Sequence, residues 1–252
     1  MKWRLIAGLL VALLLIPLAI ASLPARLAPR LLPADQLMLS GLSGSLLEGQ
    51  AARAIVQTPA GPLHLGQVHW RVHPLSLFAL APAVTLRSEW GEQRASLQAV
   101  VKGDHLHIRN LDGSFPAGLL KQFVPLAVEG QFQLLFQELE LDARGPLRAE
   151  GRVVWQDALW QSPGGARPLG TYVAELESPG ERQILGRVDT LAGLVRATGD
   201  LSLEVNTYAV DLRVEGRDRL LEPALAQALS LLAVPEDSGY RLRLNGDLAP
   251  RP

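Results

Sequence analysis

Alternation of hydrophobic and polar residues with a period of two dominates the chain from Leu37 onward. Successive side chains of a β-strand point to opposite faces, so this period predicts strands with one apolar and one solvated face. The clearest runs lie at 68–72, 97–101, 105–108, 132–142, 147–155, 201–205, 210–215 and 240–245. Because short strands and short connections favour antiparallel pairing, the pattern predicts a mostly β fold with an elongated, mainly antiparallel sheet.

Glycine- and proline-rich segments between these runs predict the turns. They are Asp112-Gly113, Arg144-Gly145-Pro146, Ser162-Pro163-Gly164-Gly165, Ser178-Pro179-Gly180 and Asn245-Gly246. A weak repeat also runs through the chain, since Gly66–Trp70 and Gly151–Trp155 both have the pattern Gly-x-Val-x-Trp. The repeat favours two similar halves, 37–124 and 125–252, divided near Pro125.

Helical spacing is rare in this sequence. The segment Glu222–Ala233 carries leucines at helical intervals, with Pro223 in its first turn and Pro235 beyond its end. It predicts one C-terminal helix packed on the sheet. A turn or two of helix is also expected at Pro116–Phe123.

The amino-terminal segment indicates in which cellular compartment the rest of the chain lies. Residues 5–23 are nineteen uncharged, mostly apolar residues that follow Lys2 and Arg4. As a helix they extend about 28 Å, close to the hydrocarbon thickness of a bilayer, and the positive-inside rule keeps the basic start in the cytoplasm. A cleaved signal peptide ending in Ala19-Ile20-Ala21 is the alternative. Both readings export the rest of the chain, and the length of the run favours an uncleaved anchor.

The predicted organisation is therefore a cytoplasmic start and transmembrane anchor at 1–23, a Pro-rich linker at 24–36 and a periplasmic β domain at 37–252. Pro24, Pro29 and Pro33 mark the linker, because each proline removes a backbone donor and restricts the residue before it. This order places the protein in the cell inner membrane as a single-pass protein, with its C-terminal domain in the periplasm.

Composition excludes several classes of protein. The 24 basic and 25 acidic residues nearly cancel, which argues against a nucleic-acid partner. The chain has no cysteine, so disulfide scaffolds, zinc fingers, iron–sulfur clusters and thiol nucleophiles are excluded. A hydrophobic content of 48% with 19% charged residues indicates a packed or membrane-attached protein.

Motifs for catalysis are missing. No phosphate-binding loop of the form G-x-x-x-x-G-K occurs, and Ser43, between Gly41 and Gly44, misses the spacing of a nucleophile elbow. Carboxylates such as Glu138, Glu140, Asp211 and Glu215 alternate with apolar residues as solvated strand positions do. We therefore expect no enzymatic activity and assign no catalytic or cofactor-binding residue.

The five histidines form two groups, His64/His69/His73 and His105/His107. In a strand, His105 and His107 share one face about 6.6 Å apart, and Asp104 stands beside them as a further possible metal ligand. Without a third ligand in a recognisable pattern, the simpler interpretation places all five on the solvated faces of strands. The sequence thus predicts no metal site and no cofactor.

Three sequence elements follow the predicted span in a fixed order. Gly44–Ala51 reads GSLLEGQA, Trp70, Pro74 and Leu77 form W-x-x-x-P-x-x-L, and Gly113 and Pro116 form G-x-x-P. With Leu47 in place of a tryptophan in the first element, this order resembles the type II secretion system protein N family. The resemblance spans roughly residues 40–120, and the remainder is similar mainly in its β character.

The resemblance implies an inner-membrane accessory component of the type II secretion system, which exports folded periplasmic proteins across the outer membrane. It implies binding to inner-membrane components of that apparatus, with the bilayer contacted through residues 5–23, and no enzymatic activity. A second hypothesis remains open: an AsmA-like periplasmic protein that handles lipids or other hydrophobic molecules in an amphipathic β-sheet groove. An open apolar groove, too large for side chains to fill, would favour this second hypothesis.

Overall fold

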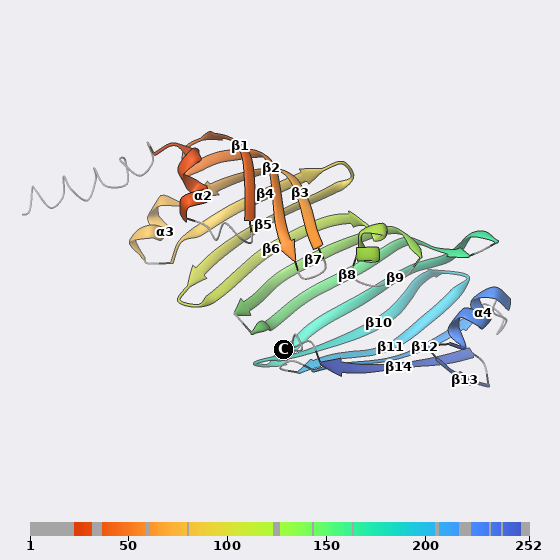
Figure 1. The fold of residues 1–252 in the computed structure, drawn as a ribbon. Coiled ribbons are helices and arrows are strands. Elements are labelled where there is room, and N and C mark those ends of the chain that lie inside the picture. Colours follow the sequence, from red (N-terminus) through yellow and green to blue (C-terminus); the bar gives the residue numbers. More distant parts are fainter. Residues whose placement is uncertain are drawn as a thin grey trace, which may run out of the picture. The chain divides into compact units, whose positions relative to one another are not determined.

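A computed structural model describes residues 23–31, 37–58, 61–79, 81–122, 127–142, 144–162, 164–204, 207–216, 223–231, 233–237 and 239–247. Antiparallel β-strands make up most of this part of the chain (Figure 1). The chain divides into two compact units between Gly103 and Asp104. The sequence suggested a division near Pro125. The strand that begins at His105 pairs with the strand after it, so both belong to the second unit.

The first unit begins with two short helices, η1 (Ala25–Leu27) and α2 (Ala28–Leu31). Its strands are β1 (Leu37–Gly44), β2 (Glu48–Thr58), β3 (Gly61–Val72), β4 (Ala83–Trp90) and β5 (Gln93–Lys102). They pair in chain order, and each pair is antiparallel. Helix α3 (Pro74–Phe78) connects β3 to β4 and starts at the proline that ends the preceding strand.

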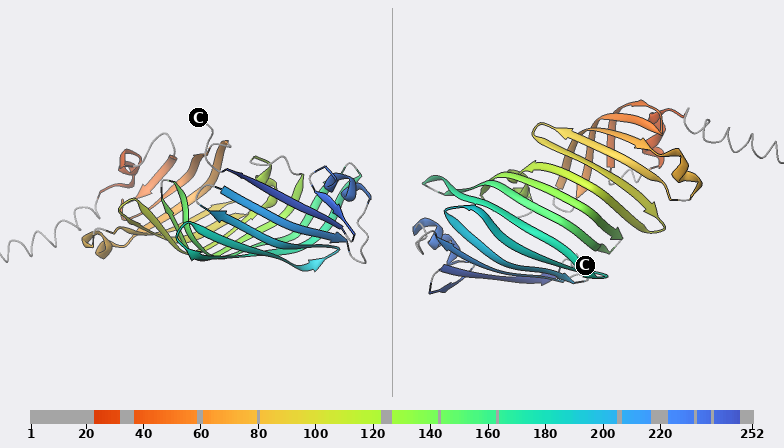
Figure 2. Two further views of the ribbon diagram at one scale, coloured as in Figure 1. Left: turned by 90° about the horizontal axis from the view of Figure 1, so that it is seen from below. Right: turned by 180° about the vertical axis from the view of Figure 1, so that it is seen from behind.

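The second unit is a larger, curved antiparallel sheet (Figure 2). Its strands are β6 (His105–Pro116), β7 (Val128–Asp142), β8 (Gly145–Ser162), β9 (Gly165–Gly180), β10 (Gln183–Gly193), β11 (Val195–Glu204), β12 (Thr207–Gly216), β13 (Val234–Glu236) and β14 (Gly239–Asp247). The order in the sheet follows the chain as far as β12, after which come β14 and then β13. Helix η2 (Ala117–Gln122) follows β6, and α4 (Pro223–Leu229) precedes β13.

The prediction of a mostly antiparallel β fold with few helices is confirmed, but two predicted turns are wrong. Asp112-Gly113 lies inside β6 and Asn245-Gly246 inside β14. Gly113 pairs with Leu134 in the ladder, and a Cβ atom on Gly246 would come within 2.9 Å of the Tyr208 ring. Gly246 makes room for the neighbouring strand, and neither pair reverses the chain.

The C-terminal helix is present but ends earlier than predicted. Helix α4 stops at Leu229, and Val234–Glu236, which includes Pro235, joins the sheet as β13. Leu225 and Leu229 are half-buried, while Gln227 between them is exposed. The amphipathic spacing thus located the helix, but pairing with β14 determines the conformation of the residues after it.

The predicted membrane anchor, residues 5–23, lies outside the described residues except for Leu23. None of the helices in the described ranges is long and apolar enough to cross a membrane. Within the predicted linker, residues 25–31 form η1 and α2, and the side chain of Ala25 is 1% exposed. Pro24 forms a β-bridge with Ser45, so this segment contacts the β1–β2 hairpin of the first unit.

Candidate functional site

The inner side of the second unit is a continuous apolar face. Two neighbouring rows of residues cross the sheet from β6 to β14 in register, and every member is apolar or glycine. One row is Gly113, Leu134, Val153, Ala174, Val188, Gly199, Leu212 and Leu242. The other is Leu111, Phe136, Gly151, Leu176, Gly186, Leu201, Val210 and Leu244. We call these two rows the apolar face.

An aromatic ladder runs beside these rows at the end of the sheet near η2. Phe115, Phe132, Trp155 and Tyr172 are cross-strand partners on β6 to β9. Their ring centroids lie 5.4, 5.5 and 5.7 Å apart, within the range of favourable aromatic pairs. The Tyr172 hydroxyl is buried and donates a hydrogen bond to the Val195 carbonyl oxygen at 2.9 Å. Burial raises the pKa of Tyr172 to about 12, so this side chain stays neutral and remains a donor.

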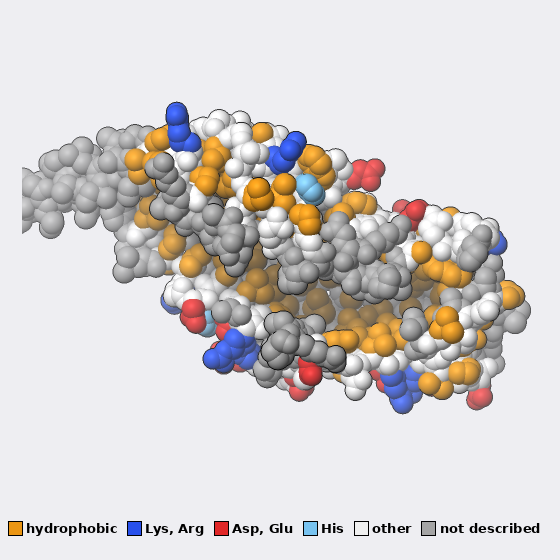
Figure 3. Space-filling model, in the orientation of Figure 1, with side chains coloured by type: hydrophobic (Ala, Val, Ile, Leu, Met, Phe, Trp, Pro, Cys, Tyr) orange, Lys and Arg blue, Asp and Glu red, His pale blue; other side chains and the backbone are white. Residues whose placement is uncertain are grey.

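The apolar face is open. Figure 3 shows a hollow floored by hydrophobic side chains where β7 to β10 lie in Figure 1. Leu134, Phe136, Val188, Leu201 and Leu212 are all only half-buried. Among the described residues, no large side chain is fully buried, and the buried set consists mainly of alanines and valines. A sheet whose large apolar side chains stay accessible differs from a filled core and offers a surface for hydrophobic molecules.

The opposite side of the same sheet is charged. A third row of residues lies between the two apolar rows, and its side chains point to the opposite face. On successive strands from β8 to β14 it carries Arg152, Glu175, Arg187, Asp200, Asp211 and Arg243. Oppositely charged residues face one another at each step except between Asp200 and Asp211. We call this side the polar face. The charged side chains of this row thus lie on one side of the sheet and the two apolar rows on the other, so water solvates mainly the polar face.

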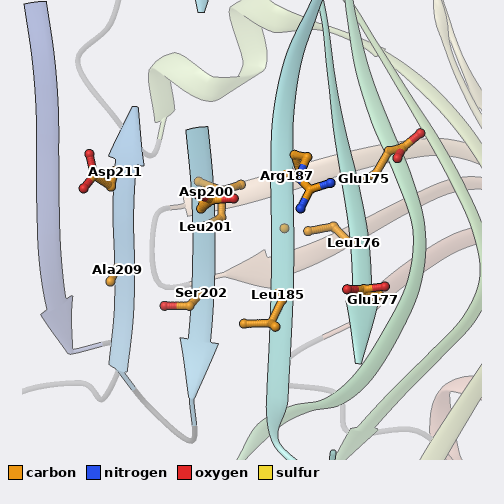
Figure 4. Close-up of a pocket in the computed structure, with 11 residues that line it drawn as sticks. Glu175, Leu176, Glu177, Leu185, Arg187, Asp200, Leu201, Ser202, Ala209 and Asp211 are labelled. Carbon is orange, nitrogen blue, oxygen red and sulfur yellow. The ribbon is translucent and has the colours of Figure 1, made fainter. Parts of the chain in front are cut away.

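A shallow depression of about 510 Å³ lies on the polar face across β9 to β12 (Figure 4). Glu175, Glu177, Asp200 and Asp211 line it together with Arg187. Asp200 and Asp211 face each other with like charge, and two arginines of β14 offset the charge of Asp211. Arg241 donates two hydrogen bonds of 2.7 Å to the Asp211 carboxylate, and Arg243 donates one of 3.3 Å. These guanidinium groups hold the pKa of Asp211 below its usual range.

The same charge network reaches β13 at the edge of the sheet. Arg213 donates two hydrogen bonds to Glu236 at 2.6 and 3.0 Å, and Arg241 lies 3.6 Å from the same carboxylate. These contacts lower the pKa of Glu236. The network joins β12, β14 and β13, so its evident role is to hold the last strands in place.

Trp70 and the Gly44–Ala51 element, two parts of the family resemblance, meet in the first unit. Trp70 on β3 is half-buried, and its indole N–H donates to the Leu46 carbonyl oxygen at 3.0 Å. Gly49 on β2 lies against the indole, since a Cβ atom there would come within 2.5 Å of Trp70 Cζ2. Gly44 has a φ of +85°, which favours glycine in the hairpin between β1 and β2. These contacts give the motif a structural role.

The histidines separate into exposed and half-buried groups. His64, His69 and His73 are exposed on β3 or just after it, where His64 stacks on Trp90 at 6.0 Å and His73 Nε2 lies 3.0 Å from Thr85 Oγ1. His105 and His107 on β6 are half-buried, which differs from the fully solvated positions expected for them. Glu140 of β7, predicted as a solvated carboxylate, lies 2.8 Å from His105 Nδ1 and 3.7 Å from His107 Nε2.

Sequence reasoning missed Glu140 as a neighbour of the histidines, because the pairing of β6 with β7 brings it to His107 and His105 across 33 and 35 residues of chain. Ser43, the weak nucleophile candidate, pairs with Gln50 in the β1–β2 hairpin. Among the other carboxylates considered, Glu138 pairs with Arg109 in the β6–β7 ladder, and Asp211 binds the two arginines of β14. The absence of catalytic residues stays a prediction.

The fold defines a class of protein: an open, amphipathic antiparallel β-sheet with one apolar and one charged face. The family model of the type II secretion system (T2SS), protein N, matches residues 35–243. The chain therefore belongs to the type II secretion system protein N family, and the resemblance read from the sequence is confirmed.

Two relatives match over nearly their whole length. The chain is 30% identical over 251 residues to the Type II secretion system protein N of Vibrio cholerae serotype O1 (strain ATCC 39315 / El Tor Inaba N16961), covering 96% of this chain and 97% of that protein. It is 27% identical over 258 residues to the Type II secretion system protein N of Aeromonas hydrophila, covering 98% and 99%. No solved structure matches the chain significantly. Membership supports a role as a component of type II secretion.

Proposed function

We propose that the protein is an inner-membrane accessory component of the type II secretion system that acts by protein–protein binding in the export of folded periplasmic proteins. The observation that carries the proposal is the family match over residues 35–243. In this role the chain performs no catalysis and binds no nucleic acid. Its partners are inner-membrane components of the secretion apparatus.

The sequence supports the proposed location. Residues 5–23 act as an uncleaved anchor in the bilayer, and Lys2 and Arg4 hold the start of the chain in the cytoplasm. Both β units then lie in the periplasm, where they can reach the periplasmic parts of neighbouring components.

Exposed hydrophobic side chains at one hairpin support a protein-binding role. At the turn from β10 to β11, Leu191 is 61% exposed and Leu194 is 50% exposed. Two large aliphatic side chains exposed at the same turn are available for apolar contact with a partner. We assign this hairpin tip as a contact with another component of the apparatus.

Deletion of the gene in its native host tests the role in secretion. We expect slower release of the exported proteins into the medium and their accumulation in the periplasm, with an unchanged total amount, and the wild-type gene should restore release. Unchanged release under conditions that induce the secretion genes would contradict the proposal.

Site-specific photo-crosslinking tests the hairpin surface. A photoreactive phenylalanine analogue at Leu191 should capture a membrane component of the apparatus in cells. The matched control is the same analogue at Glu92, in the exposed β4–β5 turn of the first unit. Equal capture from both positions, or none from Leu191 in a secreting strain, would argue against this contact.

One observation favours a second function, the handling of lipids or other hydrophobic molecules. The apolar face is open and spans the sheet from β6 to β14 without a charged residue. Acyl chains suit such a surface because they need apolar contact over a long distance and no hydrogen-bond partners. In this alternative the sheet holds acyl chains close to the inner membrane.

A pair of variants on β10 distinguishes this alternative. Val188 lies on the apolar face and Leu185 on the polar face, and both are half-buried. Val188→Asp should abolish binding of a fluorescent fatty acid to the purified full-length chain, while Leu185→Asp should retain it. If Val188→Asp impairs neither fatty-acid binding nor secretion, the apolar face has no role in either function.

A further inference from the structure

His105 and His107 on β6 and Glu140 on β7 form a compact group of three potential metal ligands. One ligand atom from each residue can be chosen so that all three lie within 4.8 Å of one another. In this arrangement His105 Nδ1 and His107 Nε2 lie 2.8 and 3.7 Å from Glu140 Oε1. Ligand atoms around a tetrahedral zinc ion lie about 3.3 Å apart, given metal–ligand distances of about 2.0–2.2 Å. The three side chains are therefore close enough together to share one ion.

The strand pairing holds this arrangement in place. His105 and His107 point to the same face because they are two residues apart on β6, and Glu140 is the direct cross-strand partner of His107. All three side chains are partly shielded: Glu140 is 15% exposed, His107 24% and His105 37%.

Asp104 supplies a further contact that suits a metal site. Its carboxylate lies 3.5 Å from Nε2 of His105, the ring nitrogen opposite to the one near Glu140. A metal-bound histidine usually donates its second N–H to a carboxylate or carbonyl, which fixes the ring and strengthens it as a ligand.

We propose that His105, His107 and Glu140 bind a late first-row divalent cation, with zinc as the representative ion. Two imidazoles and one carboxylate suit zinc and its neighbours, whereas magnesium and calcium prefer sites made only of oxygen ligands. The ion connects β6 to β7 at the start of the second unit, and a water molecule or a group from a partner completes its coordination. This assignment departs from the expectation of no metal site, because the sequence did not reveal Glu140 as the third ligand.

Metal titration of the full-length chain tests the site. The protein is purified in detergent with a histidine-free tag, stripped with a chelator and titrated with zinc chloride by calorimetry. We expect one zinc ion per chain. Binding should weaken by more than about 100-fold in His107→Ala/Glu140→Gln. It should weaken by less, about 10-fold at most, in Asp104→Asn, because the Asp104 side chain is 84% exposed and touches only the outer ring nitrogen of His105.

The control His69→Ala/His73→Ala removes two histidines from the first unit and should bind zinc as the wild type does. Cobalt provides an independent readout, since a tetrahedral Co²⁺ site with nitrogen and oxygen ligands absorbs visible light. These bands should appear in the wild type and the control and be lost in His107→Ala/Glu140→Gln, with circular dichroism confirming that the variant is folded. A stoichiometry well below one, or equal zinc binding by that folded variant, would overturn the proposal.

Discussion

The indole N–H of Trp70 donates a hydrogen bond to the carbonyl oxygen of Leu46, 3.0 Å away, and so attaches β3 to the β1–β2 hairpin. Trp155 in the second unit makes the corresponding bond to the Glu129 carbonyl oxygen, also at 3.0 Å. Both tryptophans end a Gly-x-Val-x-Trp segment, and both reach back to a residue about 25 positions earlier in the chain. The two pentapeptides thus place a tryptophan in the same kind of contact.

Trp70→Ala should destabilise the first unit. The substitution removes a large half-buried side chain and leaves the Leu46 carbonyl without its donor. We expect a loss of about 2–4 kcal/mol, somewhat below the value for a fully buried tryptophan. Thermal unfolding followed by circular dichroism measures the effect. Trp90→Ala serves as the matched control, because Trp90 is 45% exposed and should cost clearly less. Equal melting temperatures for both variants would assign Trp70 to an interface.

Gly49→Ala should also destabilise the first unit. The added Cβ atom would lie 2.5 Å from Trp70 Cζ2 and 2.7 Å from the Ser45 carbonyl oxygen, so either the indole or the hairpin backbone has to move. Overpacking of this kind costs about 1–3 kcal/mol. Gly118→Ala is the control, since a Cβ atom there meets nothing within 4 Å. A melting temperature for Gly49→Ala equal to that of Gly118→Ala would show that the hairpin accommodates the methyl group.

The fold could be predicted from the sequence wherever one face of a strand is apolar and the other polar. The runs around Val68–Val72 and Phe132–Phe136 showed this alternation and form β3 and β7. The Asp112-Gly113 pair was wrongly predicted as a turn, since a glycine inside a strand and a glycine in a turn give the same local signal. The family pattern had placed Gly113 and Pro116 at the end of a strand, and β6 does end at Pro116.

The candidate sites depend on register, which a single sequence does not reveal. Glu140 approaches His105 and His107 only because β7 pairs with β6 in one particular alignment. A shift of one residue would move Glu140 to the opposite face. The charged row of the polar face also depends on register. Glu175, Arg187 and Asp200 belong to three different strands, and only strand pairing places them side by side.

Stability should fall at acidic pH through the charge network at the end of the second sheet. The contacts of Arg241 and Arg213 lower the pKa of Asp211 and Glu236 in the folded state. A lowered carboxyl pKa adds stability above the unfolded-state value, and this contribution disappears as the pH falls through the folded-state pKa. The melting temperature should therefore decline below about pH 4.5.

Asp211→Asn tests this assignment. It should lower the melting temperature at neutral pH and flatten the decline on acidification, because the paired carboxylate has been removed. The control Glu92→Gln changes an exposed carboxyl group in the β4–β5 turn and should leave the acid profile unchanged. An acid profile for Asp211→Asn that matches the wild type would assign the decline to other groups.

The amino-terminal segment should anchor the chain in the inner membrane. Residues 5–23 are long enough to span a bilayer, and Lys2 and Arg4 precede them, so the chain should remain anchored with its carboxyl end in the periplasm. A reporter that is active only in the periplasm, fused after Pro252, should be active and should fractionate with the inner membrane. Signal peptidase requires a small residue before the cleaved bond, so Ala21→Arg would block removal of the segment. Intact-mass measurements should give the full-length chain for both wild type and Ala21→Arg. A wild-type protein beginning at Ser22, with a full-length Ala21→Arg variant, would replace the anchor with a cleaved signal peptide and leave the periplasmic location unchanged.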